Sequence, residues 1–310
     1  MLWRHELDRL QALRLFTRAV ELGSFSAVAR EARVSQPTVS KVIAALERDI
    51  GVRLIERTTT SLSTTNEGRR FYQRCRQLAD DYADAVAEVR GQAQQMIGEL
   101  TVSGPLGLGE FRLNALVVEF LSRHSGIEVE LILNDRMVDL VEEGIDVAVR
   151  LGGPLPPDAV AREIAASPRI LVASPGYLAG APALRCPDEV ERHPYIGYAG
   201  LEPRGNLTLS NGAQHVSVAT SGPYRVNSSL SLRQCFLDGI GIGSAPAWLV
   251  QDLVESGDLV RLLPEWTLPS QSVHLLYPTR RYLPRRTQTF LQFMMAAIRT
   301  LPGFALPDAA

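Results

Sequence analysis

Apolar side chains recur at helical spacing along the first thirty residues of the chain. One face of the first predicted helix carries Leu7, Leu10, Leu13, Phe16 and Val20. This helix stops near Gly23, and the hydroxyl of Ser24 can cap a second, shorter helix. The second helix is predicted to turn Phe25, Val28 and Ala29 inward. The pattern therefore predicts two helices that share one small core.

A third helix follows a turn at Arg33 and Val34. Ser35 is its predicted cap, and Pro37 fits the first turn because no intrahelical N–H bond is lost there. Its buried stripe is predicted to hold Val39, Ile43, Leu46 and Ile50. The exposed first turns then carry Gln36, Pro37, Thr38, Ser40 and Lys41. Two short helices and a turn fit either a helix-turn-helix, whose second helix enters the major groove, or an ordinary helical hairpin.

The residues of these exposed turns suit contacts with DNA. A glutamine can bond the adenine edge in two places, and serine or threonine hydroxyls can donate or accept. The helix N-terminus and Lys41 both favour phosphate groups. Residues 1–95 carry 15 Lys+Arg against 12 Asp+Glu, whereas the remaining 215 residues carry 17 against 22. A basic front joined to an acidic rear favours a polyanionic partner for the front, although chance unevenness on a solvated surface explains it as well.

The segment after the third helix predicts a small wing and a long helix. Gly51 ends the third helix, and the short apolar-polar alternation after it indicates two strands. Thr65 is a predicted cap for a helix of ~28 residues, roughly 42 Å long. A heptad seam on that helix holds Phe71, Cys75, Leu78, Tyr82, Ala85 and Val89. We expect the seam to form a dimer coiled coil; the alternative is a helix packed on its own chain.

From Gly98 onward, strand-like and helical segments alternate, which indicates a doubly wound α/β sheet. "ELTVSGP", "IEVELIL" and "IDVAVRLGG" are predicted strands, residues 111–123 are a predicted helix, and "LVEEG" is expected to close another helix. A second set runs from "PRILVASPGYLAG" to "DLVRLLPEW". "QSVHLLYP" and the helix "PRRTQTFLQFMMAAIRT" then return to the first set. The pattern predicts lobe I at about 98–167 and 272–300 and lobe II at about 168–271, crossed twice by the chain.

Composition limits the class of protein. A chain of 310 residues with 45% hydrophobic and 21% charged residues predicts two or three globular domains. No stretch approaches the roughly eighteen apolar residues of a membrane helix, and "MLWRHELDRL" has no apolar signal region. The cysteines Cys75, Cys186 and Cys235 are distant from one another and odd in number. We therefore expect a protein of the reducing cytoplasm, without a membrane segment, disulfide framework or zinc site.

Residues 23–68, "GSFSAVAREARVSQPTVSKVIAALERDIGVRLIERTTTSLSTTNEG", resemble the LysR-type transcriptional regulators. The resemblance implies an all-α winged helix-turn-helix domain at 7–65, with its motif at about 25–44, and a linker and dimerisation helix at 66–95. An α/β effector domain of the two-lobed periplasmic-binding type (type 2) would occupy 96–310. The implied DNA-facing residues are Ser35, Gln36, Pro37, Thr38, Ser40 and Lys41, with Arg33, Arg57 and Thr58 beside them. Thr60 and Ser61 stand where the family commonly has arginines, which weakens the expected contact between wing and phosphate.

The rear of the chain is similar to one subgroup of that family, through "SGPLGLG", "VASPGYLAGAP", "GIGIGSAPAWLV" and "SGDLVRLLPEW". Members of the subgroup respond to small organic acids or aromatic compounds. The resemblance implies double-stranded promoter DNA, RNA polymerase, a second copy of the chain in a dimer or tetramer, and an unidentified effector, with a carboxylate as the candidate class. It implies no cofactor, no metal and no catalytic residue.

The effector site is expected outside the carboxyl ends of the strands, between the lobes. A helix N-terminus with hydroxyl groups suits a carboxylate, and the segment 227–229 opens a predicted helix. Capping is the alternative role for Ser103 and Ser229, and a hinge salt bridge with Asp135 or Asp139 is the alternative for Arg150. The predicted effector site comprises Ser103, Pro105, Leu106, Arg150, Gly152, Asn227, Ser228, Ser229 and Gly243.

Two other classes of protein compete with a regulator. An α/β enzyme with an accessory DNA-binding front could use "GIGIGS" at 239–244 for a dinucleotide, but this segment follows a predicted helix rather than a strand. It fits a tight helix-to-strand turn better. The histidines His5, His124, His193, His215 and His274 are scattered, with no metal or catalytic spacing. A transport-type solute-binding protein requires a signal peptide. The opening residues of this chain do not resemble one, which disfavours that class.

Overall fold

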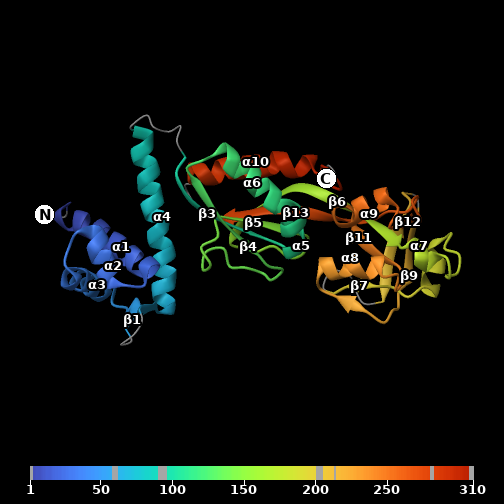
Figure 1. Cartoon of the computed structure of the whole chain (residues 1–310), viewed down its shortest axis with the longest axis horizontal. Coiled ribbons are helices and arrows are strands. Elements are labelled where there is room, and N and C mark those ends of the chain that lie inside the picture. Colours follow the sequence, from blue (N-terminus) through green and yellow to red (C-terminus); the bar gives the residue numbers. More distant parts are fainter. Residues whose placement is uncertain are drawn as a thin grey trace. The chain divides into compact units, whose positions relative to one another are not determined.

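The computed structural model describes residues 3–57, 62–89, 96–199, 205–212, 214–279 and 283–306 (Figure 1). The chain divides into two compact units. One holds residues 1–98 with short segments at 138–145 and 280–286, and the other holds the remaining residues. None of the helices in the described ranges combines the length and the apolar character needed to cross a bilayer.

The first unit is a small helical bundle with a two-stranded antiparallel wing. Its elements are α1 (Trp3–Leu22), α2 (Phe25–Ala32), α3 (Gln36–Ile50), β1 (Ile55–Arg57), β2 (Leu62–Thr64) and α4 (Asn66–Val89). The predicted caps are confirmed: Ser24 accepts from the N–H of Ala27, and Ser35 accepts from that of Thr38. Gly51 ends α3 at a φ of 77°, in the left-handed region that glycine tolerates. These local signals fix the ends of α2 and α3.

The core of the first unit differs in detail from the predicted stripes. Phe16, Val28, Val39 and Ile43 are buried as expected. Ile50, however, is 40% exposed, because it is the last residue of α3 and lies beyond the core. The buried face of α1 is also shifted, because α1 contacts α2, α3 and α4 at once. Among the residues of α1 whose side chains are described, Ala12, Leu15, Phe16 and Ala19 are buried and Leu10 is 40% exposed; the side chain of Leu7 lies outside the described residues.

The seam predicted on α4 divides into two parts. Cys75 is 2% exposed within the core of its own chain, and the ring centroid of Phe71 lies 5.5 Å from that of Phe16. Burial raises the pKa of the Cys75 thiol to about 12, so the thiol is neutral and packs as a small apolar group. Phe71 and Cys75 therefore pack on their own chain, which was the alternative for the seam. Leu78, Tyr82 and Val89 are exposed, and the side chain of Ala85 lies outside the described residues.

The second unit contains one mixed sheet whose strand order is β11-β6-β13-β5-β3-β4, with β12 also pairing with β6. The strands of this sheet are β3 (Gly98–Gly104), β4 (Ile127–Leu133), β5 (Val147–Leu151), β6 (Ala159–Ala173), β11 (Gly243–Pro246), β12 (Val260–Leu262) and β13 (Leu268–Pro278). β3 and β5 are parallel, whereas β13 is antiparallel to both β5 and β6. The long strands β6 and β13 therefore run from one half of the sheet into the other, which is the predicted double crossing between lobes.

Helices cover both halves of the sheet (Figure 1). They are α5 (Leu106–Leu108), the π-helix η1 (Gly109–Leu113), α6 (Asn114–Arg123), α7 (Pro175–Leu178), the 3₁₀-helix η2 (Pro187–Arg192), α8 (Ser229–Leu237), α9 (Ala247–Ser256) and α10 (Arg285–Thr300). Two small strand pairs complete lobe II: β7 (Gly197–Tyr198) with β10 (Arg225–Val226), and β8 (Asn206–Ser210) with β9 (His215–Ala219). Segment 239–244 connects α8 to β11, as the turn interpretation of "GIGIGS" predicts.

The expected helix ending in "LVEEG" is wrong. Residues 140–144 form turns. The side chain of Asp139 accepts hydrogen bonds from the N–H groups of Val141 and Glu142, at 2.9 and 2.8 Å. This is the bonding of a helix N-cap, and the N–H of Glu143 also bonds the carbonyl of Asp139 at 3.0 Å, so the segment begins one helix-like turn. Gly144, at a φ of 67°, and the bond from the Ile145 N–H to the carbonyl of Leu140 end the segment after this turn, so no regular helix forms.

Candidate functional site

The first turns of α3 form an exposed surface on the first unit. Gln36, Pro37, Thr38 and Lys41 are exposed, and Ser40 is half-buried. The hydroxyl groups of Ser35 and Thr38 lie 2.7 Å apart and share a hydrogen bond. Ser35 thus completes the helix cap, and the remaining polar groups of the turn face solvent.

Arg33, Arg57 and Thr58 flank this surface in the sequence. Arg33 is exposed at the C-terminus of α2, with a φ of 55°, and its backbone N–H bonds the carbonyls of Ala29 and Arg30. Arg57 is the last residue of β1 and pairs with Leu62 of the wing. Its side chain, and the whole of Thr58, lie outside the described residues.

Glu47 holds the start of the wing, a role that the sequence patterns did not predict. Its Oε1 accepts hydrogen bonds from the backbone N–H groups of Leu54 and Ile55, at 2.8 and 3.0 Å. The other side of the wing rests on α4, where the hydroxyl of Thr65 accepts from the N–H of Gly68 at 2.9 Å. A Cβ on Gly68 would lie 1.9 Å from the carbonyl oxygen of Leu54, so only glycine permits this approach. These residues set the position of the wing relative to α3.

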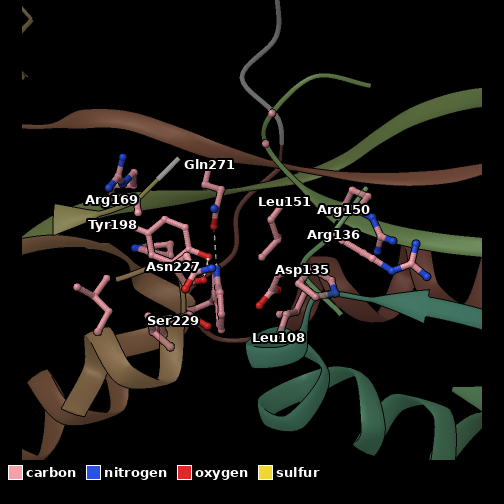
Figure 2. Close-up of a pocket in the computed structure, with 18 of the residues that line it drawn as sticks. Leu108, Asp135, Arg136, Arg150, Leu151, Arg169, Tyr198, Asn227, Ser229 and Gln271 are labelled. Atoms are coloured by element: carbon pink, nitrogen blue, oxygen red, sulfur yellow. Dashed lines mark hydrogen bonds between the residues drawn. The ribbon is translucent and has the colours of Figure 1, made fainter. Parts of the chain in front are cut away.

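A cavity of about 400 Å³ lies between the two lobes of the second unit (Figure 2). Its volume suits a small organic ligand. Five of the residues predicted from the sequence line it, and they come from the strand ends and from the start of α8. They are Pro105, Arg150, Gly152, Asn227 and Ser229.

Ser103 and Leu106 lie outside the lining. Ser103 is fully buried, and its hydroxyl accepts a hydrogen bond from Arg150 at 3.0 Å. Ser103 therefore positions the guanidinium of Arg150, and in this structure it neither lines the cavity nor caps a helix. The backbone N–H of Leu106 donates to the carboxylate of Asp135 at 3.1 Å. Leu106 itself is 37% exposed.

Ser228 and Gly243 are also outside the lining. Ser228 caps α8 by accepting from the N–H of Ser231 at 3.3 Å. Capping was the alternative role for Ser229, but Ser228 fills it, and Ser229 is left facing the cavity. Gly243 is buried in β11, where it pairs with Val172 of β6.

Several lining residues were missed by sequence reasoning. Arg169 donates to the hydroxyl of Ser244 at 2.7 Å, and the hydroxyl of Tyr195 donates to the same oxygen at 3.0 Å. The indole N–H of Trp248 donates to Gln271 at 3.0 Å, and this bond joins α9 to β13. The charged Arg169 within the apolar run "RILVA" was a usable signal, because a buried strand rarely holds an unneeded charge.

The cavity is cationic at its polar positions and apolar between them. Arg136, Arg150 and Arg169 face a single acidic residue, Asp135, among the lining residues that the structure describes. Burial, with a further contribution from the charge of Asp135, raises the pKa of Tyr198, whose neutral hydroxyl donates to the carbonyl of Asn227 at 2.8 Å. The apolar lining includes Leu108, Leu151, Leu232, Trp248 and Leu249. This combination favours a small anion with an apolar body.

Each of the two units matches the model of a known protein family. Residues 10–69 match the model of the bacterial regulatory helix-turn-helix protein, lysR family, and residues 93–299 match that of the LysR substrate binding domain.

The chain belongs to the LysR family of transcriptional regulators.

Individual relatives agree with this membership. The HTH-type transcriptional regulator PtxR of Pseudomonas aeruginosa is 31% identical over 291 residues, which span 92% of this chain and 93% of PtxR. The full-length structure of the Vibrio cholerae virulence activator AphB is 26% identical, has a TM-score of 0.58, and covers 93% of this chain and 98% of AphB. CrgA of Neisseria meningitidis is 28% identical, has a TM-score of 0.58, and covers 92% and 97%.

These matches bear on both units. This LysR regulator has a helix-turn-helix DNA-binding domain followed by a two-lobed substrate-binding domain, as in the full-length structures. The curated relatives are named as transcriptional regulators, and nothing in the comparisons supports the enzyme alternative.

Proposed function

We propose that this LysR regulator reads promoter DNA with the first turns of α3 and responds to an organic acid held between the lobes of its second unit. The exposed N-terminal turn of α3, with Gln36, Thr38 and Lys41 uncovered by the core, carries the DNA-reading part. Gln36 is the proposed base reader, because its amide can bond an adenine edge in two places. Lys41, Arg33 and Arg57 are proposed phosphate contacts.

The cationic cavity supports an organic acid, aliphatic or aromatic, as the effector. Its lining has three arginines and one aspartate among the described residues. Asn227 and Ser229 add polar groups at the N-terminus of α8, where the helix dipole favours an anion. An acid that binds one arrangement of the lobes more tightly shifts the protein toward that arrangement and thereby changes promoter binding.

Self-association is proposed through the exposed part of α4. Leu78, Tyr82 and Val89 are 53%, 50% and 89% exposed on this helix. Their burial against a second copy, in a dimer or tetramer, would place two α3 helices on symmetric half-sites. Leu78→Ser should therefore shift the protein toward monomer in sedimentation equilibrium. Val118→Ser, which changes a residue 58% exposed on α6, should leave the assembly unchanged. Equal behaviour of the two variants would reject this interface.

The proposed partners follow from these roles: double-stranded promoter DNA, RNA polymerase at the bound promoter, and the effector, all in the cytoplasm. Fluorescence anisotropy with DNA fragments selected from a random library tests the central proposal. We expect selective binding that weakens steeply as salt rises, because arginines and lysine displace counterions from phosphates. Binding that is equal for selected and random DNA would reject promoter reading. An organic acid that changes the anisotropy curve would support the effector role.

A further inference from the structure

Two arginines of the cavity are each held by a buried serine from their own lobe. In lobe I, Arg150 at the end of β5 donates to the fully buried Ser103 at 3.0 Å and to the carbonyl of Val149 at 2.7 Å. In lobe II, Arg169 of β6 donates to Ser244, which is 1% exposed, at 2.7 Å. Both guanidinium groups are thus anchored, and both line the same cavity.

The anchored arginines lie on opposite sides of the cavity. Figure 2 shows Arg150 on the side of Leu108 and Asp135, and Arg169 on the side of Tyr198 and Asn227. The lining also includes apolar side chains, and Figure 2 shows one of them, Leu151, between the two arginines. The cavity therefore has two fixed cationic ends separated by an apolar middle.

We propose that the effector is a dianion, a dicarboxylate whose two carboxylates pair with Arg150 and Arg169 across an apolar spacer. This rests on the proposed function, because it specifies the acid that the cavity would bind. Arginine pairs with a carboxylate through two parallel hydrogen bonds, so each end is recognised by geometry as well as charge. Three arginines and one carboxylate, that of Asp135, are the charged groups among the described lining residues, so the lining carries more positive than negative charge.

A monocarboxylate fits this cavity less well. It can pair with one arginine only, and it would displace water from the second without replacing the lost bonds. The dianion also contacts both lobes through charge-assisted bonds. Its binding therefore favours the arrangement in which both arginines reach the ligand, which is the differential affinity that a regulatory ligand requires.

Matched pairs of acids test the proposal on the full-length protein. Isothermal titration with succinate, glutarate, adipate and terephthalate would be compared with titration of the monomethyl ester of each acid. The ester keeps the carbon skeleton and removes one charge. We expect at least one diacid to bind about tenfold or more tightly than its own monoester, with the preferred spacer length reporting the span between the arginines.

Variants assign the two ends. Arg150→Gln and Arg169→Gln should each reduce the affinity for the preferred diacid to about that of its monoester. A monoester has one carboxylate and can pair with the arginine that remains, so its own affinity should change little. Arg162→Gln is the matched control, because Arg162 is exposed on β6 and lies outside the lining. A reduction in the control equal to that in either variant would contradict the assignment.

The comparison of each diacid with its monoester uses the wild-type protein. A variant that fails to fold therefore cannot affect this result. If every diacid binds with the same affinity as its monoester, the proposal of a dianionic effector is rejected. The proposal of an effector with one carboxylate is then retained. If no acid binds while selective DNA binding persists, both the dianion and the carboxylate effector fail, but promoter reading survives.

Discussion

The guanidinium of Arg233 lies over the ring of Phe111, with its central carbon 5.1 Å from the ring centroid. Phe111 belongs to η1 of lobe I, whereas Arg233 belongs to α8 of lobe II. α8 also approaches lobe I closely at Gly107 of α5, where an added Cβ would lie 1.9 Å from the hydroxyl oxygen of Ser229. The lobes therefore touch directly beside the cavity, and this contact must open when they separate.

The Phe111–Arg233 pair should stabilise the closed lobes. A cation over an aromatic ring contributes about 0.5–2 kcal/mol, with the larger values where water is excluded, and the side chain of Arg233 is 15% exposed. Phe111→Leu removes the ring face but keeps apolar bulk, and Arg233→Gln removes the cation. A double-mutant cycle on the free energy of unfolding of the second unit should give a coupling energy of this size. A coupling near zero would show that the two groups do not interact in solution.

The ion pair between Arg233 and Asp252 should make the stability of the second unit depend on pH. Arg233 donates to both carboxylate oxygens of Asp252, at 2.6 and 2.5 Å, and this pairing lowers the pKa of Asp252 below its usual value. A lowered carboxyl pKa in the folded state contributes stability above the unfolded pKa of about 3.9, and that stability is lost as pH falls through the folded value.

Urea unfolding at pH 7 and at about pH 3 measures this dependence. Asp252→Asn should destabilise the second unit at pH 7 and have less effect at low pH, where the wild-type carboxyl is already protonating. An equal effect at both values would contradict the ion pair. Glu255→Gln is a control on the same helix, because Glu255 accepts a hydrogen bond from the uncharged Gln251.

Gly68→Ala should destabilise the first unit strongly. The added methyl would lie 1.9 Å from the Leu54 carbonyl oxygen, so either the wing or α4 must move. Overpacking of this kind destabilises by about 1–3 kcal/mol. Hydrogen exchange of the amides in α4 and the wing would report the loss. Gly180→Ala, where nothing lies within 4 Å of the added Cβ, should leave exchange unchanged.

Glu47→Ala should release the start of the wing. It removes the acceptor of the Leu54 and Ile55 N–H groups, and unpaired, partly buried donors cost about 1–3 kcal/mol. Glu47→Gln keeps one side-chain oxygen and should retain more of that stability. Thermal unfolding of the two variants distinguishes the roles: equal destabilisation would mean that the charge, and not the oxygen acceptor, holds the wing.

Gln36→Ala should weaken binding to the selected promoter sequence by about 1–3 kcal/mol, with little effect on random DNA. The physical reason is that Gln36 is exposed on the first turn of α3 and can reach a base edge, whereas phosphate contacts come from other side chains. Anisotropy titrations on both DNAs at one salt concentration measure the difference. An equal loss on both would reject the base-reading role.

Features that depend on neighbouring residues could be predicted from the sequence. Helix caps form between residues that are close in the sequence, as they do at Ser24, Ser35 and Thr65 and at the helix end at Gly51. The sequence alone therefore shows the residues that form them. The alternation of strands and helices in the second unit was equally clear, because apolar periodicity reports which face of each element is buried.

Features made by distant residues required the tertiary structure. Phe71 and Cys75 continue the heptad spacing of Leu78, yet Phe71 packs beside Phe16 and Cys75 lies in the core of its own chain. The serine-held arginines of the cavity join positions 47 and 75 residues apart, and the bond between Trp248 and Gln271 joins α9 to β13. Periodicity identifies which side chains are buried, but only the packed fold decides which of them meet, because each contact depends on elements that are far apart in the chain.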